Sequence, residues 1–273
     1  MQYVIGFIIA LFITLTGVGA GTITVPILVL FLGVPAPVAV SIGLMFSAAV
    51  KLILVPAQAM RGNIAWRTLG YMLLGGAPGV LIGSLVLKQL VTAGSENVVN
   101  LLLGIILVAT SSWQILFSFR PMGQRSEVKD RSHWLSWLMF PVGAEVGFSS
   151  AGAGALGSAA LLSLTPLAPA QVVGTDIAFG FVVSLIGSGA HWFTPSSDST
   201  LLLQLIAGGI VGAVSGTLLS THIPRRPLRF ALWIWLLVLG GQFLFNSYKI
   251  YRGERGEVLS HQHVTGFASR SGN

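Results

Sequence analysis

The chain has 273 residues, of which 53% are hydrophobic and only 8% charged, and its mean hydropathy is +0.83. Soluble domains carry about 25% charged residues, so this composition predicts an all-α integral membrane protein. The formal net charge of +7 comes from basic residues in short loops between apolar runs. That is the positive-inside pattern, and it excludes nucleic acid as a partner. The absence of cysteine excludes disulfides, thiolate metal sites and a cysteine nucleophile.

The first segment, residues 2–32, consists of two apolar arms around the sequence GVGAG, from Gly17 to Gly21. As helices, the arms would be ~22 Å and ~16 Å long at about 1.5 Å per residue. Neither crosses a hydrocarbon core of roughly 30 Å, so we predict a re-entrant helical hairpin. The second arm would then point the N–H groups and positive dipole of its N-terminus at the middle of the membrane, which favours an anion.

The rest of the chain alternates apolar spans with polar loops. Spans are predicted at 36–55, 68–87 and 98–119, followed by a basic cytoplasmic loop at 120–132. A second interrupted segment, 133–164, is predicted to be another hairpin, broken from Ser149 to Gly154. Further spans follow at 168–193, 201–221 and 228–248, and a polar tail occupies 249–273.

The two halves of the chain repeat with an offset of 133 residues. Gly19-Ala20-Gly21 recurs as Gly152-Ala153-Gly154. With the same offset, four glycines of the first half fall on four of the second: Gly75, Gly76, Gly79 and Gly83 on Gly208, Gly209, Gly212 and Gly216. Their four-residue spacing predicts close helix packing. Internal duplication is typical of secondary transporters, whose site lies at the repeat interface near the midplane.

The orientation of the halves has two solutions. If each hairpin only enters the membrane and returns, each half has three full spans and the repeats are inverted. If each interrupted segment crosses once, the chain has eight spans and the halves are parallel. The charge distribution favours inversion, because one face then carries nearly all the short-loop cations: Arg61, Arg67, the 120–132 loop, Arg225, Arg226 and Arg229.

The hairpin tips and their neighbours are the predicted substrate site. Backbone N–H groups beside hydroxyls suit an oxyanion, although the hydroxyls also suit caps of their own half-helices. The predicted substrate-binding residues are Thr16, Gly17, Gly19, Gly21, Thr22, Ser149, Ser150, Gly152, Gly154 and Thr175.

Polar residues inside apolar spans are costly and suggest function. Asp176 suits a proton acceptor or a partner for Lys51, and Glu145 suits proton coupling or an interfacial position. Gln58 and His191 occupy equivalent span ends in the two halves and are candidates for coupling or for polar interface residues. The histidines lack ligand spacing with carboxylates, so we predict no metal site and no cofactor.

The spacing GVGAG-x4-P-x-L, from Gly17 to Leu28, resembles the G-x-G-G-G-x4-P-x-L pattern of the TauE/SafE family of membrane transporters, also called sulfite exporters. Gln171 to Asp176 resembles the family's A-x-G-T-S stretch, and the resemblance covers about residues 3 to 248. It implies paired re-entrant hairpins and export of small sulfur oxyanions or organosulfonates across the bacterial inner membrane. Ala20, Ala159 and Asp176 depart from the family pattern.

We therefore predict an anion exporter rather than an enzyme, with the lipid bilayer and a small anion as partners and a homodimer left open. One alternative is an intramembrane serine protease that uses Ser149 or Ser150 with His191, because Gly147-Phe148-Ser149-Ser150 is similar to the G-x-S-G of rhomboid proteases. The other alternative is a channel or a non-transporting membrane scaffold.

Overall fold

The computed structural model describes residues 1–16, 19–118, 130–190, 199–219, 228 and 230–249, and all regular structure within these ranges is helical. The helices are α1 (Gln2–Thr16), α2 (Ala20–Leu32), α3 (Ala36–Met60), α4 (Trp66–Thr92), α5 (Glu96–Ser118), the short 3-10 helix η1 (Ser132–Trp134), α6 (Leu135–Ser149), α7 (Ala153–Leu164), α8 (Pro169–Ala190), α9 (Ser199–Leu219) and the last helix, Phe230–Lys249.

Six of these helices are long and apolar enough to cross a membrane: α3, α4, α5, α8, α9 and the last helix. The arms of the two interrupted segments are shorter. In the first, α1 has 15 residues and α2 has 13; in the second, α6 has 15 and α7 has 12. At about 1.5 Å per residue, none of these four reaches across the hydrocarbon core. The chain is therefore a multi-pass membrane protein with two pairs of short arms.

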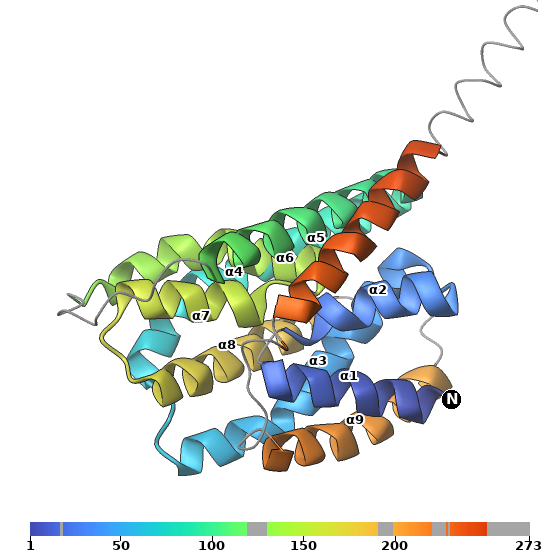
Figure 1. Ribbon diagram of the computed structural model, residues 1–273. Helices are drawn as coiled ribbons and strands as arrows, with labels where there is room; N and C mark the ends of the chain where they lie inside the picture. The colour runs from blue at the N-terminus through green and yellow to red at the C-terminus, as the bar shows by residue number, and fades with distance from the viewer. Residues whose placement is uncertain (17–18, 119–129, 191–198, 220–227, 229, 250–273) are drawn as a thin grey trace, which may run out of the picture.

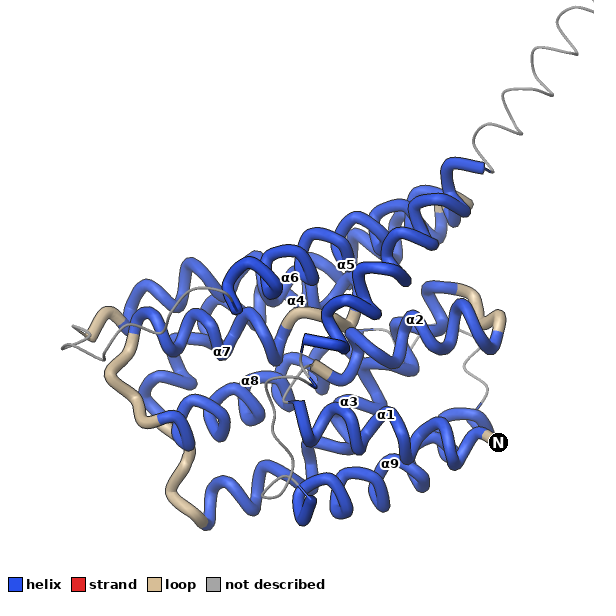
Figure 2. The backbone as a smooth tube through the Cα atoms, viewed as in Figure 1, coloured by secondary structure: helices blue, strands red, loops and turns tan. Residues whose placement is uncertain are grey.

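The two pairs of arms point in opposite directions. In Figure 1, α1 and α2 open toward one end of the molecule and α6 and α7 toward the other. The break between α6 and α7 lies near the centre of Figure 2. The connection after α7 lies at the same end as the connection between α3 and α4, which carries Arg61. We refer to α1–α2 as hairpin 1 and to α6–α7 as hairpin 2.

The two central helices are α3 and α8. In each of them 61% of the most apolar window is buried, compared with 33% in α5. Phe46 of α3 and Phe179 of α8 are fully buried. A Cβ atom built on Gly209 would overlap the ring of Phe46, and one built on Gly76 would overlap the ring of Phe179. Each central helix thus fills a groove that a glycine opens in a helix of the other half.

The glycine rows of α4 and α9 allow close approach to the hairpin arms, as their spacing predicts. A Cβ on Gly75 would overlap the carbonyl oxygen of Ser136, and a Cβ on Gly79 that of Phe140. The corresponding positions Gly208 and Gly212 face the carbonyl oxygens of Tyr3 and Phe7. All four pairs keep the offset of 133 residues. At these positions the packing of α4 on α6 is therefore repeated by α9 on α1.

Some helices are longer than their apolar runs predict. Helix α3 continues one turn past Pro56 to Met60, and α4 runs through Pro78. Proline removes one backbone hydrogen bond, but neighbouring helices and side chains compensate for this inside a membrane protein. Hairpin 2 is anchored at its start by Asp130, whose carboxylate accepts the N–H of Ser132 at 3.0 Å. That hydrogen bond holds the pKa of the Asp130 carboxyl below its usual value.

Candidate substrate site at the hairpin tips

Each hairpin turns at a glycine that begins its second arm. Gly19 precedes α2 with φ −57° and ψ 139°, and Gly152 precedes α7 with φ +90°. The positive φ requires glycine at position 152, since a side chain there would be strained. Neither α2 nor α7 has a side-chain cap on its first-turn N–H groups. Each helix therefore starts at a residue that has no side chain to accept from the first-turn N–H groups.

The turn of hairpin 2 contacts the start of α2. A Cβ on Gly21 would overlap both the carbonyl oxygen and the hydroxyl of Ser150. A Cβ on Gly43 of α3 would lie 3.0 Å from the Ser150 Oγ atom and 3.2 Å from Val25. The absence of side chains at Gly21 and Gly43 thus makes room for Ser150. The two hairpin tips meet inside the protein, although they are about half the chain apart in sequence.

The hydroxyl groups at the tips differ in what they bind. Ser149 donates to the carbonyl oxygen of Glu145 at 2.8 Å and accepts the N–H of Ala151 at 3.2 Å. Thr16 donates to the carbonyl oxygen of Phe12 at 2.6 Å. Ser150 is 5% exposed, and its Oγ atom has no hydrogen-bond partner in the described residues. Ser149 and Thr16 therefore act as caps and back-bonds of their own helices, whereas Ser150 presents an unsatisfied hydroxyl at the contact between the tips.

The remaining predicted site residues are spread more widely. Thr22 is buried, Gly19 and Gly152 are buried, and Gly154 is partly buried. The Thr175 hydroxyl accepts the N–H of Ala65 at 3.0 Å, so it binds the residue that precedes α4. Gly17 and His191 lie outside the described residues.

Gln58 belongs to the end of the molecule rather than to the tips. Its Oε1 atom accepts a hydrogen bond from the side-chain amide of Asn63 at 2.8 Å, and its carbonyl oxygen accepts the N–H of the same residue at 3.0 Å. Gln58 therefore stabilises the connection between α3 and α4.

Lys51 of α3 and Asp176 of α8 form a buried pair of opposite charges. They are 6% and 5% exposed, and the Asp176 carboxylate acts electrostatically on the Lys51 ammonium group. Asp176 also accepts a hydrogen bond from Ser158 at 2.7 Å, and a Cβ on Gly157 would overlap its Oδ1 atom. Asp176 thus links the central helix α8 to the second arm of hairpin 2.

Glu145 lies one turn before the break in hairpin 2, and its carboxylate packs on Gly152. A Cβ on Gly152 would lie 2.8 Å from Oε2 and 3.0 Å from Oε1. The Oε1 atom is buried and has no hydrogen-bond partner in the described part of the chain. Both Glu145 and Ser150 thus bring unsatisfied polar atoms to the tips. No group of three or more His, Cys, Asp or Glu side chains that could hold a metal ion occurs among the residues described.

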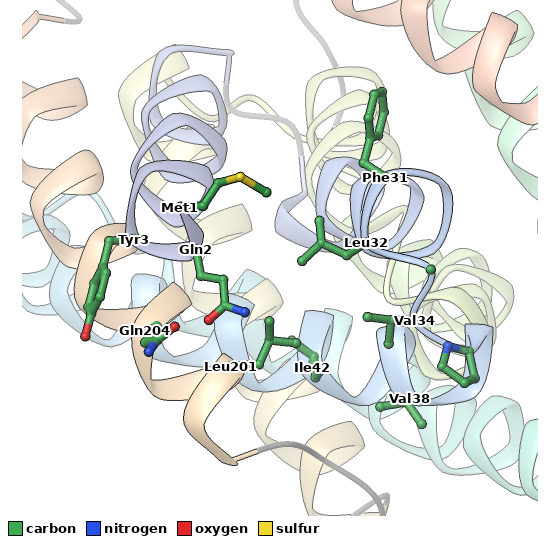
Figure 3. A pocket seen from close by; sticks show the side chains of 12 residues that line it. Met1, Gln2, Tyr3, Phe31, Leu32, Val34, Val38, Ile42, Leu201 and Gln204 are labelled. Carbon is green, nitrogen blue, oxygen red and sulfur yellow. The ribbon is translucent and has the colours of Figure 1, made fainter.

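A cavity of about 870 Å³ opens at the base of hairpin 1. Figure 3 shows that its wall is mostly apolar, with the side-chain amides of Gln2 and Gln204 among the sticks. We call it the outer cavity; its lining residues are Met1, Gln2, Tyr3, Phe31, Leu32, Gly33, Val34, Pro35, Val38, Ile42, Leu201 and Gln204. These come from α1, α2, α3, α9 and the α2–α3 connection, at the end of the molecule opposite Arg61.

Comparison with known proteins places these features in a family. Residues 3–243 match the family described as "Sulfite exporter TauE/SafE". The chain belongs to the TauE/SafE family. It is 29% identical over 205 residues to the "Probable membrane transporter protein YjnA" of Bacillus subtilis (strain 168), which covers 72% of this chain and 81% of that protein. No solved structure matches. The family match and the relative's name both support the conclusion that this TauE/SafE protein is a membrane transporter.

Sequence reasoning missed two residues that surround the tips, Gly43 and Ser158. Gly43 is the equivalent of Asp176 at the offset of 133, and Ser158 is the equivalent of Val25. The alignment of the two halves therefore pointed to these positions. In the second half Asp176 accepts a hydrogen bond from Ser158, and in the first half the equivalent residues Gly43 and Val25 pack on each other. Only the structure shows that Gly43 is the position that receives Ser150.

Proposed function

We propose that this TauE/SafE protein exports a small sulfur oxyanion or organosulfonate through a site where the two hairpin tips meet. The observation that carries the proposal is the contact of Gly21 with Ser150, at which the start of an uncapped helix meets a buried, unsatisfied hydroxyl. Helix N-termini and hydroxyl donors are the groups that replace the lost hydration of an oxyanion. A transporter of this kind needs no nucleophile, and we infer that the chain is not an enzyme.

The membrane potential favours export of an anion. In a bacterial cell the cytoplasm is negative, so outward movement of one negative charge releases about 2.3 kcal/mol per 100 mV. An anion therefore leaves the cell down the electrical gradient once it has entered the site. A fixed site between two opposed hairpins, reached alternately from each side, is the arrangement found in many secondary transporters.

We infer that the two halves are inverted repeats and that each hairpin is re-entrant. The support is the repeated packing of Gly75 on Ser136 and of Gly208 on Tyr3, together with hairpins that open at opposite ends. In the parallel arrangement with eight spans, the connection after α7 would lie on the opposite side from the α3–α4 connection. The two connections lie at the same end, which supports inversion.

The outer cavity fits access from outside the cell. The end of the molecule that carries Arg61 and Arg67 is the cytoplasmic end by the positive-inside rule. The outer cavity is at the opposite end, at the base of hairpin 1. We infer that an exported anion leaves the tips through this cavity into the space outside the inner membrane.

Flux in proteoliposomes tests the function. We expect saturable efflux of sulfite, thiosulfate or taurine with the wild-type protein and its loss in Gly21→Ala, because the added methyl group would displace Ser150. Gly70→Ala is the matched control, since a Cβ at Gly70 meets no atom within 4 Å. Efflux that does not saturate would favour a channel. Equal efflux by the Gly21→Ala and wild-type proteins would mean that the substrate site is not at the hairpin tips.

A further inference from the structure

The N-terminus of α7 already has an acidic side chain placed over it. The carboxylate of Glu145 lies beside Gly152, the residue that precedes α7. Helix α7 has 12 residues and no side-chain cap, so its first-turn N–H groups favour negative charge. Glu145 therefore places an acidic side chain beside the turn from which α7 starts.

A second, independent observation indicates that a ligand belongs here. The side chain of Ser150 is only 5% exposed. Its Oγ atom lies beside Gly21 at the start of α2 and has no hydrogen-bond partner among the described residues. The Glu145 Oε1 atom is likewise buried without a partner. Buried polar atoms without partners are rare, because each costs the free energy of its lost hydration. Two such atoms lie at one pair of helix ends, where a polar ligand would satisfy both.

We propose that Glu145 couples anion binding to a proton: its carboxyl group is neutral when an anion occupies the tips, and its carboxylate form excludes the anion. The inference rests on the proposed function, because it assumes an anion between the tips. The proton comes from water and binds one carboxylate oxygen of Glu145, and no bond of the transported anion forms or breaks. A neutral carboxyl group can also donate its proton to the anion as a hydrogen bond. Two negative charges at one site would repel each other.

No other charged group in the described residues takes this role from Glu145. The titratable or charged side chains on the helices packed against α6 are Arg67, Tyr71 and Lys88 of α4, Glu96 of α5, Asp176 of α8 and His133 of η1. The Glu145 Oε1 atom has no hydrogen-bond partner in the described residues, and α2 and α7 carry no titratable side chain. The equivalent of Glu145 in the first half is Phe12. The asymmetry predicts one proton for each anion bound.

The test is the pH dependence of anion affinity in the purified full-length protein. Thiosulfate and sulfate are suitable probes because both stay fully ionised between neutral and alkaline pH. For the wild-type protein we expect the Kd to rise by about tenfold per pH unit once the free carboxyl group is ionised, as linkage of one proton requires. In Glu145→Gln the Kd should stay constant. Glu96→Gln is the control, since Glu96 is exposed at the start of α5, and it should keep the wild-type slope.

A slope that persists in Glu145→Gln, or that disappears in Asp176→Asn while Glu145 is intact, would overturn the inference and leave the proposed function standing. If the wild-type protein binds neither of these anions, coupling of the two to Glu145 is excluded, whereas efflux of sulfite or taurine still tests the proposed function separately. Infrared difference spectra of the wild-type protein give a second readout that needs no folded variant. Thiosulfate added at alkaline pH should produce the band of a protonated carboxyl group, and its absence would contradict the coupling.

Discussion

At the scale of single residues, Ser149 and Ser150 have opposite roles although they are neighbours. Ser149 makes two hydrogen bonds that end α6. Ser150 makes none with its hydroxyl group and has φ +60°, in the left-handed region. That conformation costs roughly 1–2 kcal/mol for an L-residue. A strained residue with an unsatisfied hydroxyl at a contact between two turns is better explained by ligand binding than by stability.

We therefore expect Ser150→Gly to raise the free energy of unfolding by roughly 1 kcal/mol, because glycine adopts this conformation without strain. The same change should weaken anion binding, because the hydroxyl group is lost. Ser150→Ala should weaken binding equally without the gain in stability. Thermal unfolding and anion titration of the purified variants measure both effects.

Ser149→Ala is the contrast to these variants. It should lower the free energy of unfolding by about 0.5–1.5 kcal/mol, the net value of a typical hydrogen bond. If Ser150→Gly bound anions as tightly as the wild-type protein, the hydroxyl of Ser150 would have no part in the site.

At the scale of helices, the glycine rows decide how closely α4 and α9 pack on the hairpins. A methyl group added at Gly79 would meet the carbonyl oxygen of Phe140, a backbone atom that cannot turn away. Overpacking of this kind costs about 1–3 kcal/mol. Gly79→Ala should lower the free energy of unfolding by that amount, and Gly212→Ala at the equivalent position should do the same. Gly70→Ala, in the same helix as Gly79 but with open space around it, should change stability little.

The comparison between Gly79→Ala and Gly70→Ala separates packing from helix propensity. Both replace glycine with a better helix former, so only the contact with α6 distinguishes them. Equal stability of the two variants would mean that α6 does not pack against α4 in the membrane as the structure has it.

At the scale of the whole molecule, the inverted and parallel arrangements predict opposite locations for two loops of the second half. The native chain has no cysteine, so each introduced cysteine is a unique label. In the inverted arrangement, Ala168→Cys should react only from the cytoplasm and Thr200→Cys only from outside the cell. Both positions are exposed. A membrane-impermeant thiol reagent applied to intact cells measures the difference.

Two sites in the first half serve as references, because both arrangements place them identically. Met60→Cys should be protected in intact cells and Thr92→Cys should react; both side chains are exposed. Reaction of Ala168→Cys from outside, with these references behaving as stated, would exclude inverted repeats.

Much of the fold could be predicted from the sequence because the bilayer leaves few choices. Apolar runs must become helices there, and polar or glycine-rich breaks such as Gly152 end them. Six long apolar helices are present in the described residues, but α3 ends at Met60 rather than at residue 55 and α4 ends at Thr92 rather than at residue 87. Proline removes one backbone hydrogen bond, and this loss does not end α3 at Pro56.

The candidate site was predictable only in part. The glycine breaks and the offset of 133 residues indicate two turns, and the structure brings Gly21 and Ser150 into contact. Sequence alone could not separate Ser150 from Ser149, since the direction of a hydroxyl depends on backbone dihedrals. It also could not place Thr175, whose hydroxyl binds the backbone of Ala65.

Composition and periodicity by themselves determined that this chain is a helical membrane protein, since long apolar runs in lipid satisfy their backbone groups within helices. Only the tertiary structure decided which groups come together: Glu145 beside Gly152 within hairpin 2, and, across the two halves, Ser150 beside Gly21 and Lys51 near Asp176. The reason is physical. A helix-forming pattern is local, whereas a binding site depends on distances between residues that the sequence separates.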